Sequence, residues 1–404
     1  MKSEKNCRQF FSAESLNTGR QPELDMVKAI ALLFMILFHS YDAWGTESYG
    51  PGLKFFALLQ SLSGAGCFMV CMGINMCYAR HHTPKAFLLR GLALLTVSQL
   101  VNLLRISIPG LIAYHMTGKE RFVGFMLDAV QSDILTFAGL AFLMMALFTA
   151  LRLRKEWIFA AGIMMNLLMI PLAVSPRSMG GFWMNRLLSL FIRTDSSLFP
   201  LCTHFVFVAF GFLAGSRYQR IADKDALAKR ILLICAPIAV IYYTLRLSIP
   251  FPFLPDFHSV REPSMGTDAI GVIMNTLIFL ALCHKASQAW CGGRAPAFLM
   301  QVSKNMSTYY CISDILLGIT ATVLFACGGL KHGNWLPMLY AVLVIAVCRA
   351  VVVCNEHTIH FSIAKLSGPK AVIIYFLIWG ATLVMALYAS SLSSDPAMIA
   401  SAFA

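Results

Sequence analysis

The sequence predicts an all-α, polytopic bundle of membrane-spanning helices, and three observations support this fold class. First, 58% of the 404 residues are hydrophobic and only 13% are charged, about half the charged fraction of a typical soluble domain. Second, apolar stretches of roughly 20 residues recur from end to end, and each is long enough to cross a bilayer core as a helix. Third, the alternation of apolar and polar residues that is typical of membrane strands is absent.

Eleven apolar stretches are expected to span the membrane. Each is expected to be a helix, because a helix satisfies its own backbone hydrogen bonds in lipid. Their boundaries, good to a few residues, are 27–45, 54–79, 88–108, 127–151, 157–175, 199–216, 231–249, 268–286, 307–328, 336–354 and 371–391. The spans form one transmembrane domain over residues 25–392. A polar N-terminal arm at 1–24, expected to be loose, precedes this domain, and a short tail at 393–404 follows it.

The net charge is +13, and the Lys and Arg residues are distributed unevenly between the two sides of the membrane. With the N-terminus in the cytoplasm, the inner segments hold 22 of the 32 Lys and Arg residues and the outer segments hold 10. This asymmetry predicts a cytoplasmic N-terminus and an outer C-terminus, and the protein is expected to be an integral protein of the plasma (inner) membrane. The basic excess is therefore interpreted as topological, and no nucleic-acid site is predicted. The cysteines are interpreted as packing residues, and no metal site is predicted.

The first span carries polar residues at informative spacings. Lys28 and His39 are eleven residues apart, which is ~16 Å and about three turns along a helix, so their side chains share a face. Asp25 and Asp42 lie three residues from Lys28 and His39, where side chains can meet. A nearby carboxylate favours the protonated imidazole and fixes its tautomer. His39 is thus either a general base for a hydroxyl or amine or a packed, hydrogen-bonded histidine.

The pattern Leu24-Asp25-x-x-Lys28-x10-His39 resembles the first span of the transmembrane acyltransferase superfamily. That superfamily includes acyltransferase family 3 and the heparan-α-glucosaminide N-acetyltransferase group. In the acyltransferase-3 branch this span commonly reads Leu-Asp-x-x-Arg, ten residues, then His. Lys28 stands where that branch has arginine, which keeps the positive charge but loses the planar fork that suits phosphate.

Further segments resemble the same superfamily in the same order, so that the resemblance covers roughly residues 22–325. They are Gly66–Asn75, Pro84–Arg90, Asp133–Leu140, Phe199–Leu201 followed by Gly211 and Gly215, and Ser303–Tyr310.

The resemblance implies an enzyme of ten or more spans that moves an acyl group, often acetyl from acetyl-CoA, across the membrane. The acceptor implied is a hydroxyl or amine of an extracytoplasmic sugar or glycan. Acyl-CoA, the acceptor and the lipid bilayer are therefore the expected partners, with acyl-CoA as a donor substrate and no permanently bound cofactor. Lys28 would hold donor phosphates, and His39 would deprotonate the acceptor or carry the acyl group transiently.

Four other polar residues keep alternative interpretations. Asp133 either orients His39, binds the acceptor or forms a structural ion pair. Arg90 is either a topology anchor or a contact for a CoA phosphate. Asn305 either caps the ninth span or binds the donor. His204 is either a second imidazole of the site or a satisfied core histidine.

Three longer outer segments, at 109–126, 176–198 and 250–267, are the expected walls of an extracytoplasmic site. The second fits a short amphipathic helix at the membrane surface, and the prolines at 250–255 predict an extended chain. Two other functions remain open. One is a transporter or a lipid or glycan translocase in which intramembrane His and Asp relay protons, and the other is a family member without catalysis.

Overall fold

A computed structural model describes residues 10–44, 63–79, 81–127, 132–173, 182–194, 197–248, 267–290, 293–328, 335–356 and 371–392. Within these residues every secondary-structure element longer than an isolated bridge is a helix. Strand-like pairing there is limited to two isolated bridges, Phe11 with Ile221 and Ser132 with Ser197. The all-α fold class is therefore confirmed.

Each of the eleven predicted spans overlaps a described helix, and eight helices are long and apolar enough to cross a membrane. In chain order the helices are α1 Pro22–Ala43, α3 Ala65–Tyr78, α4 Pro84–Asn102, the π-helix η1 Leu103–Ser107, α5 Ile108–Thr117, α6 Arg121–Leu127, α7 Ile134–Ala150, α8 Lys155–Ala173, α9 Phe182–Ser189, α10 Leu201–Tyr218, α11 Lys224–Ser248, α12 Thr267–Ala289, α13 Arg294–Lys304, α14 Met306–Ala326, α15 Trp335–Cys354 and α16 Ala371–Leu392.

The third span is longer than predicted. Helix α4 continues through η1 into α5 as one helical run, Pro84–Thr117, of 34 residues. At about 1.5 Å per residue this run is longer than the ~30 Å hydrocarbon core of a bilayer. The segment 109–126, expected to connect two spans on the outer side, is therefore mostly helical, as the end of this run and α6.

The fourth span begins later than predicted, and this changes the place of Asp133. Helix α7 begins at Ile134 rather than near 127, and Asp133 is its N-cap residue rather than a residue well inside the span. The Asp133 carboxylate accepts a hydrogen bond from the Thr136 amide, which has no partner within the helix. Aspartate is preferred at this position for that reason.

Other expectations for connecting segments had mixed outcomes. A short helix does form within 176–198, as α9, with Trp183 and Leu187 exposed. The segment 250–255 and the tail at 393–404 lie outside the described residues. The expectation of a loose arm is wrong for residues 10–20, because Asn17 donates to the carbonyl oxygens of Tyr218 and Ile221 at 3.1 and 2.8 Å. These bonds dock the arm onto the turn that follows α10.

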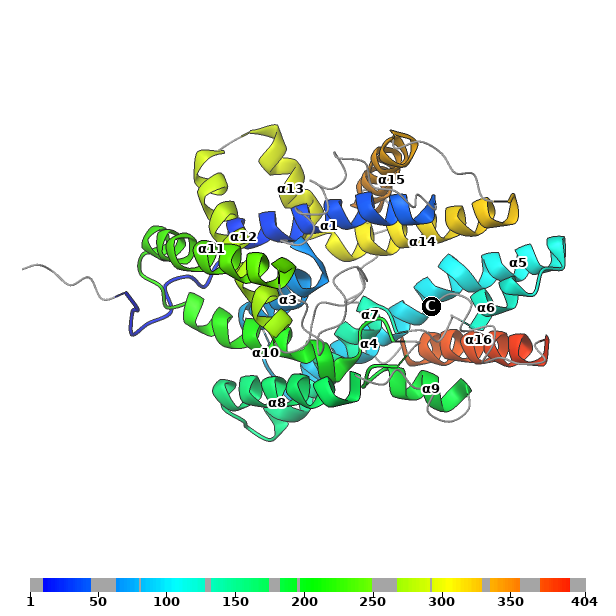
Figure 1. The fold of residues 1–404 in the computed structure, drawn as a ribbon, viewed down its shortest axis with the longest axis horizontal. Coiled ribbons are helices and arrows are strands. Elements are labelled where there is room, and N and C mark those ends of the chain that lie inside the picture. The colour runs from blue at the N-terminus through cyan, green and yellow to red at the C-terminus, as the bar shows by residue number, and fades with distance from the viewer. Residues whose placement is uncertain are drawn as a thin grey trace, which may run out of the picture.

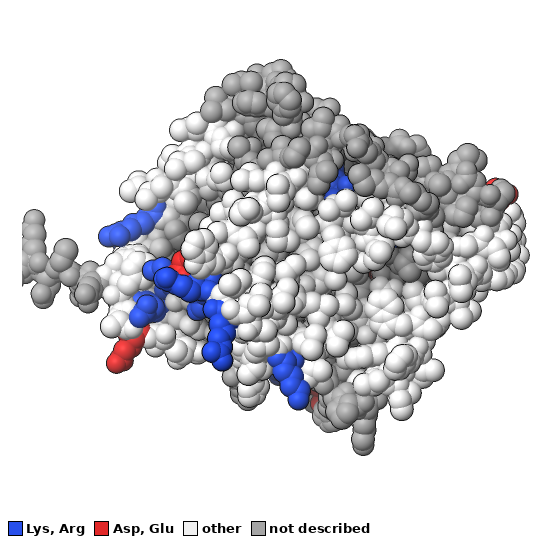
Figure 2. Space-filling view, turned by 90° about the horizontal axis from the view of Figure 1, so that it is seen from below, with Lys and Arg blue, Asp and Glu red and all other residues white. Residues whose placement is uncertain are grey.

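Helix α1 packs against more of the other helices than its place at the start of the chain would suggest. It packs against α3, α12, α13, α14 and α15, and Figure 1 shows α14 running alongside it. On the face of the molecule seen in Figure 2, most of the visible Lys and Arg side chains are gathered toward one side, beside a broad surface with few charged residues. Such a surface suits contact with lipid, with the basic groups outside the hydrocarbon.

Helices α3 and α10 pack most closely at two glycines. A Cβ at Gly73 would lie 2.1 Å from the Val208 carbonyl oxygen, and one at Gly211 would lie 2.1 Å from the Val70 carbonyl oxygen. The backbones therefore approach to a distance that only residues without a side chain allow.

We predict that Gly211→Val destabilises the protein by ~1–3 kcal/mol, because the new side chain must separate two packed helices. A lower midpoint of thermal unfolding for the purified protein in detergent would measure this. Gly380→Ala in α16 is the matched control, since nothing lies within 4 Å of a Cβ there, and it should unfold at or slightly above the wild-type midpoint. Identical midpoints for wild type and Gly211→Val would contradict the packing.

Candidate functional site

The N-terminal turns of α1 contain a buried carboxylate that gathers polar groups from three segments. Asp25 accepts hydrogen bonds from Arg20 Nε at 2.5 Å and Ser303 Oγ at 2.6 Å, and its Oδ1 lies 3.0 Å from Lys28 Nζ. The predicted proximity of Asp25 and Lys28 is thus confirmed. Because an ammonium has three donors, the contact with Asp25 leaves Lys28 able to bind a further anion.

A second buried carboxylate, Glu23, strengthens this end of α1. Lys224 Nζ lies 2.6 Å from Glu23 Oε1, and the hydroxyl of Tyr218 donates to the same oxygen. Acidic residues in the first turn also interact favourably with the helix dipole. Three cations, Arg20, Lys28 and Lys224, therefore surround two carboxylates, which leaves a net positive charge at this end.

The opposite end of α1 carries His39 and Asp42. His39 Nδ1 lies 3.4 Å from Asp42 Oδ2, and the two side chains are 51% and 64% exposed. The predicted proximity of these residues is confirmed. With Nδ1 facing the carboxylate, Nε2 is the imidazole atom available to accept a proton from a bound molecule.

An ion pair joins Arg105 of η1 to Asp314 of α14. Arg105 Nη1 is 2.8 Å from Asp314 Oδ2, and the side chains are only 15% and 9% exposed. Both residues lie within electrostatic reach of His39. Neither residue was predicted from the sequence to belong to the site. A guanidinium inside predicted span 88–108 was the signal that could have found the pair.

The π-helical turn that carries Arg105 has a cause in the sequence. Pro109 lacks the amide hydrogen that would bond to the carbonyl of Arg105 four residues earlier, and its ring crowds that carbonyl. A π turn accommodates such a break within a continuous helix. Across the interface, a Cβ at Gly318 would lie 2.1 Å from Arg105 Cγ and 2.6 Å from its carbonyl oxygen. Gly318 therefore gives Arg105 the space to reach Asp314 one turn away on α14.

Asp133 completes the polar cluster from the start of α7. Its Oδ1 accepts hydrogen bonds from Ser98 Oγ at 2.7 Å and the Thr136 amide at 2.6 Å. Its Oδ2 is buried and has no hydrogen-bond partner among the described residues. Asp133 lies within electrostatic reach of Arg105 and of Tyr310 on α14. No hydrogen bond or ion pair joins Asp133 to His39 in the described part of the chain, so a role in orienting His39 has no contact to support it.

The two other residues predicted to bind the donor lie apart from this cluster. The exposed Arg90 places its guanidinium 5.2 Å from the centre of the Phe142 ring. The side chain of Asn305 does not cap α14, because Nδ2 donates instead to the Gln301 carbonyl and to Glu356 Oε1, at 3.2 and 3.1 Å. Within the described residues, neither side chain forms a hydrogen bond or ion pair with Lys28.

His204 has the environment of a core histidine. It is buried, its Nδ1 lies 3.1 Å from the Pro200 carbonyl oxygen, and its ring touches the rings of Phe137, Phe199 and Phe207. This packing supports the structural interpretation of His204 and gives it no place among the polar groups around His39.

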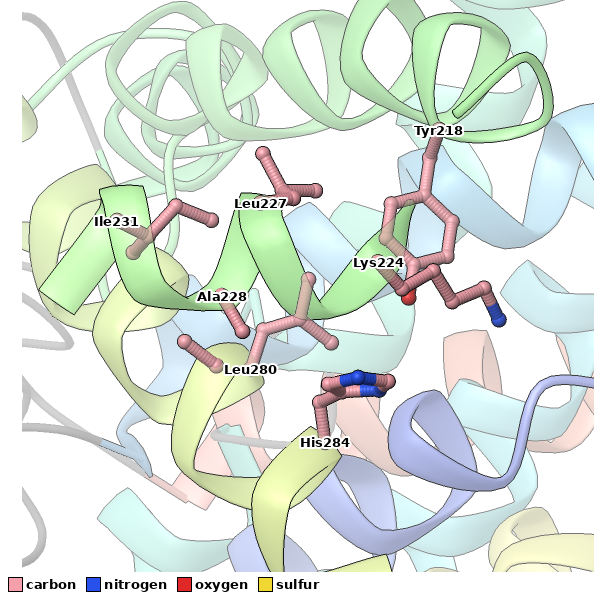
Figure 3. Close-up of a pocket in the computed structure, with 8 residues that line it drawn as sticks. Tyr218, Lys224, Leu227, Ala228, Ile231, Leu280 and His284 are labelled. Carbon is pink, nitrogen blue, oxygen red and sulfur yellow. The ribbon is translucent and has the colours of Figure 1, made fainter. Parts of the chain in front are cut away.

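A small hollow lies between α11 and α12, as Figure 3 shows. Tyr218, Lys224 and His284 contribute its polar atoms, and the remaining lining is apolar. The hollow is partly open and its cavity volume is about 10 Å³, roughly the room for one water molecule and far below the ~300–1,000 Å³ typical of sites for small molecules and cofactors. This hollow is therefore not a candidate for the donor site.

The fold and the site define an integral membrane protein with a charged cluster inside its helical bundle. The model of the family described as heparan-alpha-glucosaminide N-acetyltransferase, catalytic, matches residues 20–245, which is more than half of the chain. The chain therefore belongs to this family, and membership supports a membrane acetyltransferase. Neither the curated proteins nor the solved structures contain a match to the chain. His39, Arg105 and Asp133 lie within the matched region, whereas Tyr310 and Asp314 lie beyond it.

We predict that Arg105→Met destabilises the protein by about 3–5 kcal/mol, because it leaves the Asp314 charge buried without its partner. The double variant Arg105→Met/Asp314→Leu should recover most of this loss, since it removes both charges. Denaturant unfolding of the wild-type, single-variant and double-variant proteins in detergent completes the cycle. If the two substitutions act additively, the ion pair does not contribute as the geometry indicates.

Proposed function

We propose that the protein transfers an acetyl group from cytoplasmic acetyl-CoA to a hydroxyl or amine of an extracytoplasmic sugar or glycan. The observation that carries this proposal is the His39–Asp42 pair, half-exposed and beside the Arg105–Asp314 ion pair, in a chain of an acetyltransferase family. The proposal also places the protein in the plasma (inner) membrane with its N-terminus in the cytoplasm, in line with the distribution of basic residues.

In the proposed reaction His39 Nε2 accepts the proton of the acceptor hydroxyl or amine. The acceptor atom then forms a bond to the thioester carbonyl carbon, and the carbonyl electron pair moves to oxygen. When the carbonyl re-forms, the carbon–sulfur bond breaks and the imidazolium returns its proton to the departing CoA sulfur. Asp42 stabilises the imidazolium between these two transfers. Transient acetylation of His39 is a second route to the same product.

The proposed donor site lies at the other end of α1. Excess positive charge around Asp25 and Glu23 suits the phosphates of acetyl-CoA, and Lys28 is the cation on the His39 side of that group. The ~16 Å along the helix between Lys28 and His39 suits a donor whose charged end and thioester are joined by an extended chain. Arg90 and Asn305 remain candidates for further donor contacts, without a described hydrogen bond to Lys28.

A proton-coupled transporter or a lipid or glycan translocase is the alternative, because a buried Arg–Asp pair within electrostatic reach of a histidine also suits proton relay. Family membership favours the enzyme. A family member that has lost catalysis would keep the fold and the Arg105–Asp314 pair but would give no acetyl transfer in any condition.

His39→Ala should abolish incorporation of labelled acetyl into cell-envelope glycan, because the general base is lost; proton-transfer groups typically contribute about 10²–10⁴-fold to a rate. Membranes carrying wild-type or variant protein in equal amount would be supplied with labelled acetyl-CoA. His204→Ala is the matched control, since this histidine is packed against phenylalanine rings in the core and bonds to the Pro200 carbonyl oxygen. If wild-type membranes move solute down a proton gradient but transfer no acetyl group, the proposed enzymatic function is wrong.

Lys28→Arg should leave the KM for acetyl-CoA unchanged or lower it, because a guanidinium binds phosphate through two parallel hydrogen bonds. Lys28→Met should raise that KM roughly 10-fold, as expected for loss of a hydrogen-bonded charge. Steady-state kinetics with varied acetyl-CoA would measure both. The control is Arg154→Met, at a 78% exposed side chain, which should behave as wild type. A collapse of donor use in Lys28→Arg would argue against phosphate binding.

A further inference from the structure

Two buried hydrogen-bonding atoms of the polar cluster have no protein partner among the described residues. One is the donor Arg105 Nε, and the other is the acceptor Asp133 Oδ2. Leaving such atoms unpaired costs ~1–3 kcal/mol each, and more when the group is charged. Both side chains are otherwise firmly held, Arg105 by Asp314 at 2.8 Å and Asp133 by Ser98 and Thr136. The unpaired atoms are therefore rigidly placed, as a binding site requires.

Tyr310 of α14 is a third polar residue of this region. It precedes Asp314 by one turn on α14 and lies within electrostatic reach of Arg105, Asp133 and Asp314. The region between η1, α7 and α14 thus offers a guanidinium donor, a carboxylate acceptor and a phenol that can do both. A molecule with several adjacent hydroxyl groups, each both donor and acceptor, matches this set.

The charge of the cluster decides between kinds of ligand. Among the described residues, the carboxylates of Asp42 and Asp314 act on His39 and that of Asp133 lies within electrostatic reach of Arg105, so three carboxylates accompany one guanidinium in the cluster. A phosphate or a carboxylated ligand would add negative charge to a region that already has an excess of it. A neutral or cationic polyhydroxylated ligand avoids this repulsion.

We propose that Arg105 and Asp133, with Tyr310, bind adjacent hydroxyl groups of the acceptor sugar beside His39. This inference rests on the proposed function for its identification of the ligand as an acceptor. It gives Asp133 the acceptor-binding role in preference to orientation of His39 or a structural ion pair. Arg105 Nε donates to one hydroxyl oxygen, and Asp133 Oδ2 accepts from a neighbouring hydroxyl.

Two substitutions test these contacts with little disturbance of the fold. Asp133→Asn keeps an oxygen for Ser98 and the Thr136 amide, and asparagine is as good an N-cap as aspartate, but it replaces the free acceptor with a donor. Arg105→Lys keeps a positive charge for Asp314 and removes the Nε–H. Ser98→Ala is the matched control, because it alters the hydrogen bonding of Asp133 only at Oδ1.

Binding of labelled D-glucosamine to the full-length protein in detergent, without acetyl-CoA and in a His39→Ala background, is the measurement. Cyclohexylamine is a competitor with the same ring size and amine but no hydroxyls, and D-glucuronate tests the charge argument. The protein with Arg105 and Asp133 intact should prefer D-glucosamine to both. Asp133→Asn and Arg105→Lys should each weaken D-glucosamine binding roughly 10-fold and leave cyclohexylamine unchanged, while Ser98→Ala should change little.

The inference is overturned if the protein with Arg105 and Asp133 intact fails to distinguish D-glucosamine from cyclohexylamine, which would mean that only water occupies these atoms. It is also overturned if both variants bind D-glucosamine as that protein does. Because the assay contains no acetyl-CoA, sugar binding that is lost in these variants would support the site even if acetyl transfer were absent. If the protein transfers acetyl groups but Asp133→Asn and Arg105→Lys bind D-glucosamine normally, the proposed function stands and this inference is rejected.

Discussion

The ion pair between Arg105 and Asp314 is the interaction on which the polar interior of this protein depends. It joins the π turn of the long α4–α5 helix to α14, and α14 lies against α1, which carries His39. Charged groups at membrane depth are tolerated when they pair within the protein. By fixing one another, Arg105 and Asp314 allow three further ionisable residues, His39, Asp42 and Asp133, to gather around the same region.

Helix α1 separates two polar regions with different character. Its beginning holds Glu23 and Asp25, which tie it to the N-terminal arm, α10, α11 and α13 through cations and hydroxyls. Its far end presents a half-exposed imidazole, and the charged groups that the described residues place near it are two carboxylates and one guanidinium. An anionic, phosphate-bearing donor suits the first region, and a neutral or cationic acceptor suits the second. The opposite charge balance of the two ends is the physical basis for the proposed division between donor and acceptor.

Much of this arrangement was predictable because it is local in sequence. Apolar length predicted the helices, and the spacing of Lys28 and His39 to Asp25 and Asp42 predicted two contacts that the structure contains. The cap at Asp133 was missed because the apolar pattern begins before α7 does. The partnership of Arg105 with Asp314 spans 209 positions, and spacing alone carries no information about which helices pack together. The need for a glycine at position 318 likewise could not be predicted from the sequence, because it depends on the contact with Arg105.

The central claim is that the two ends of α1 serve substrates on opposite sides of one membrane. Sealed vesicles carrying the protein with its N-terminus outward, loaded with D-glucosamine and given labelled acetyl-CoA only in the outer medium, test this claim most directly. We predict that labelled N-acetylglucosamine accumulates inside the vesicles, and that His39→Ala vesicles accumulate none. Acetylation only when donor and acceptor share one compartment would contradict the account.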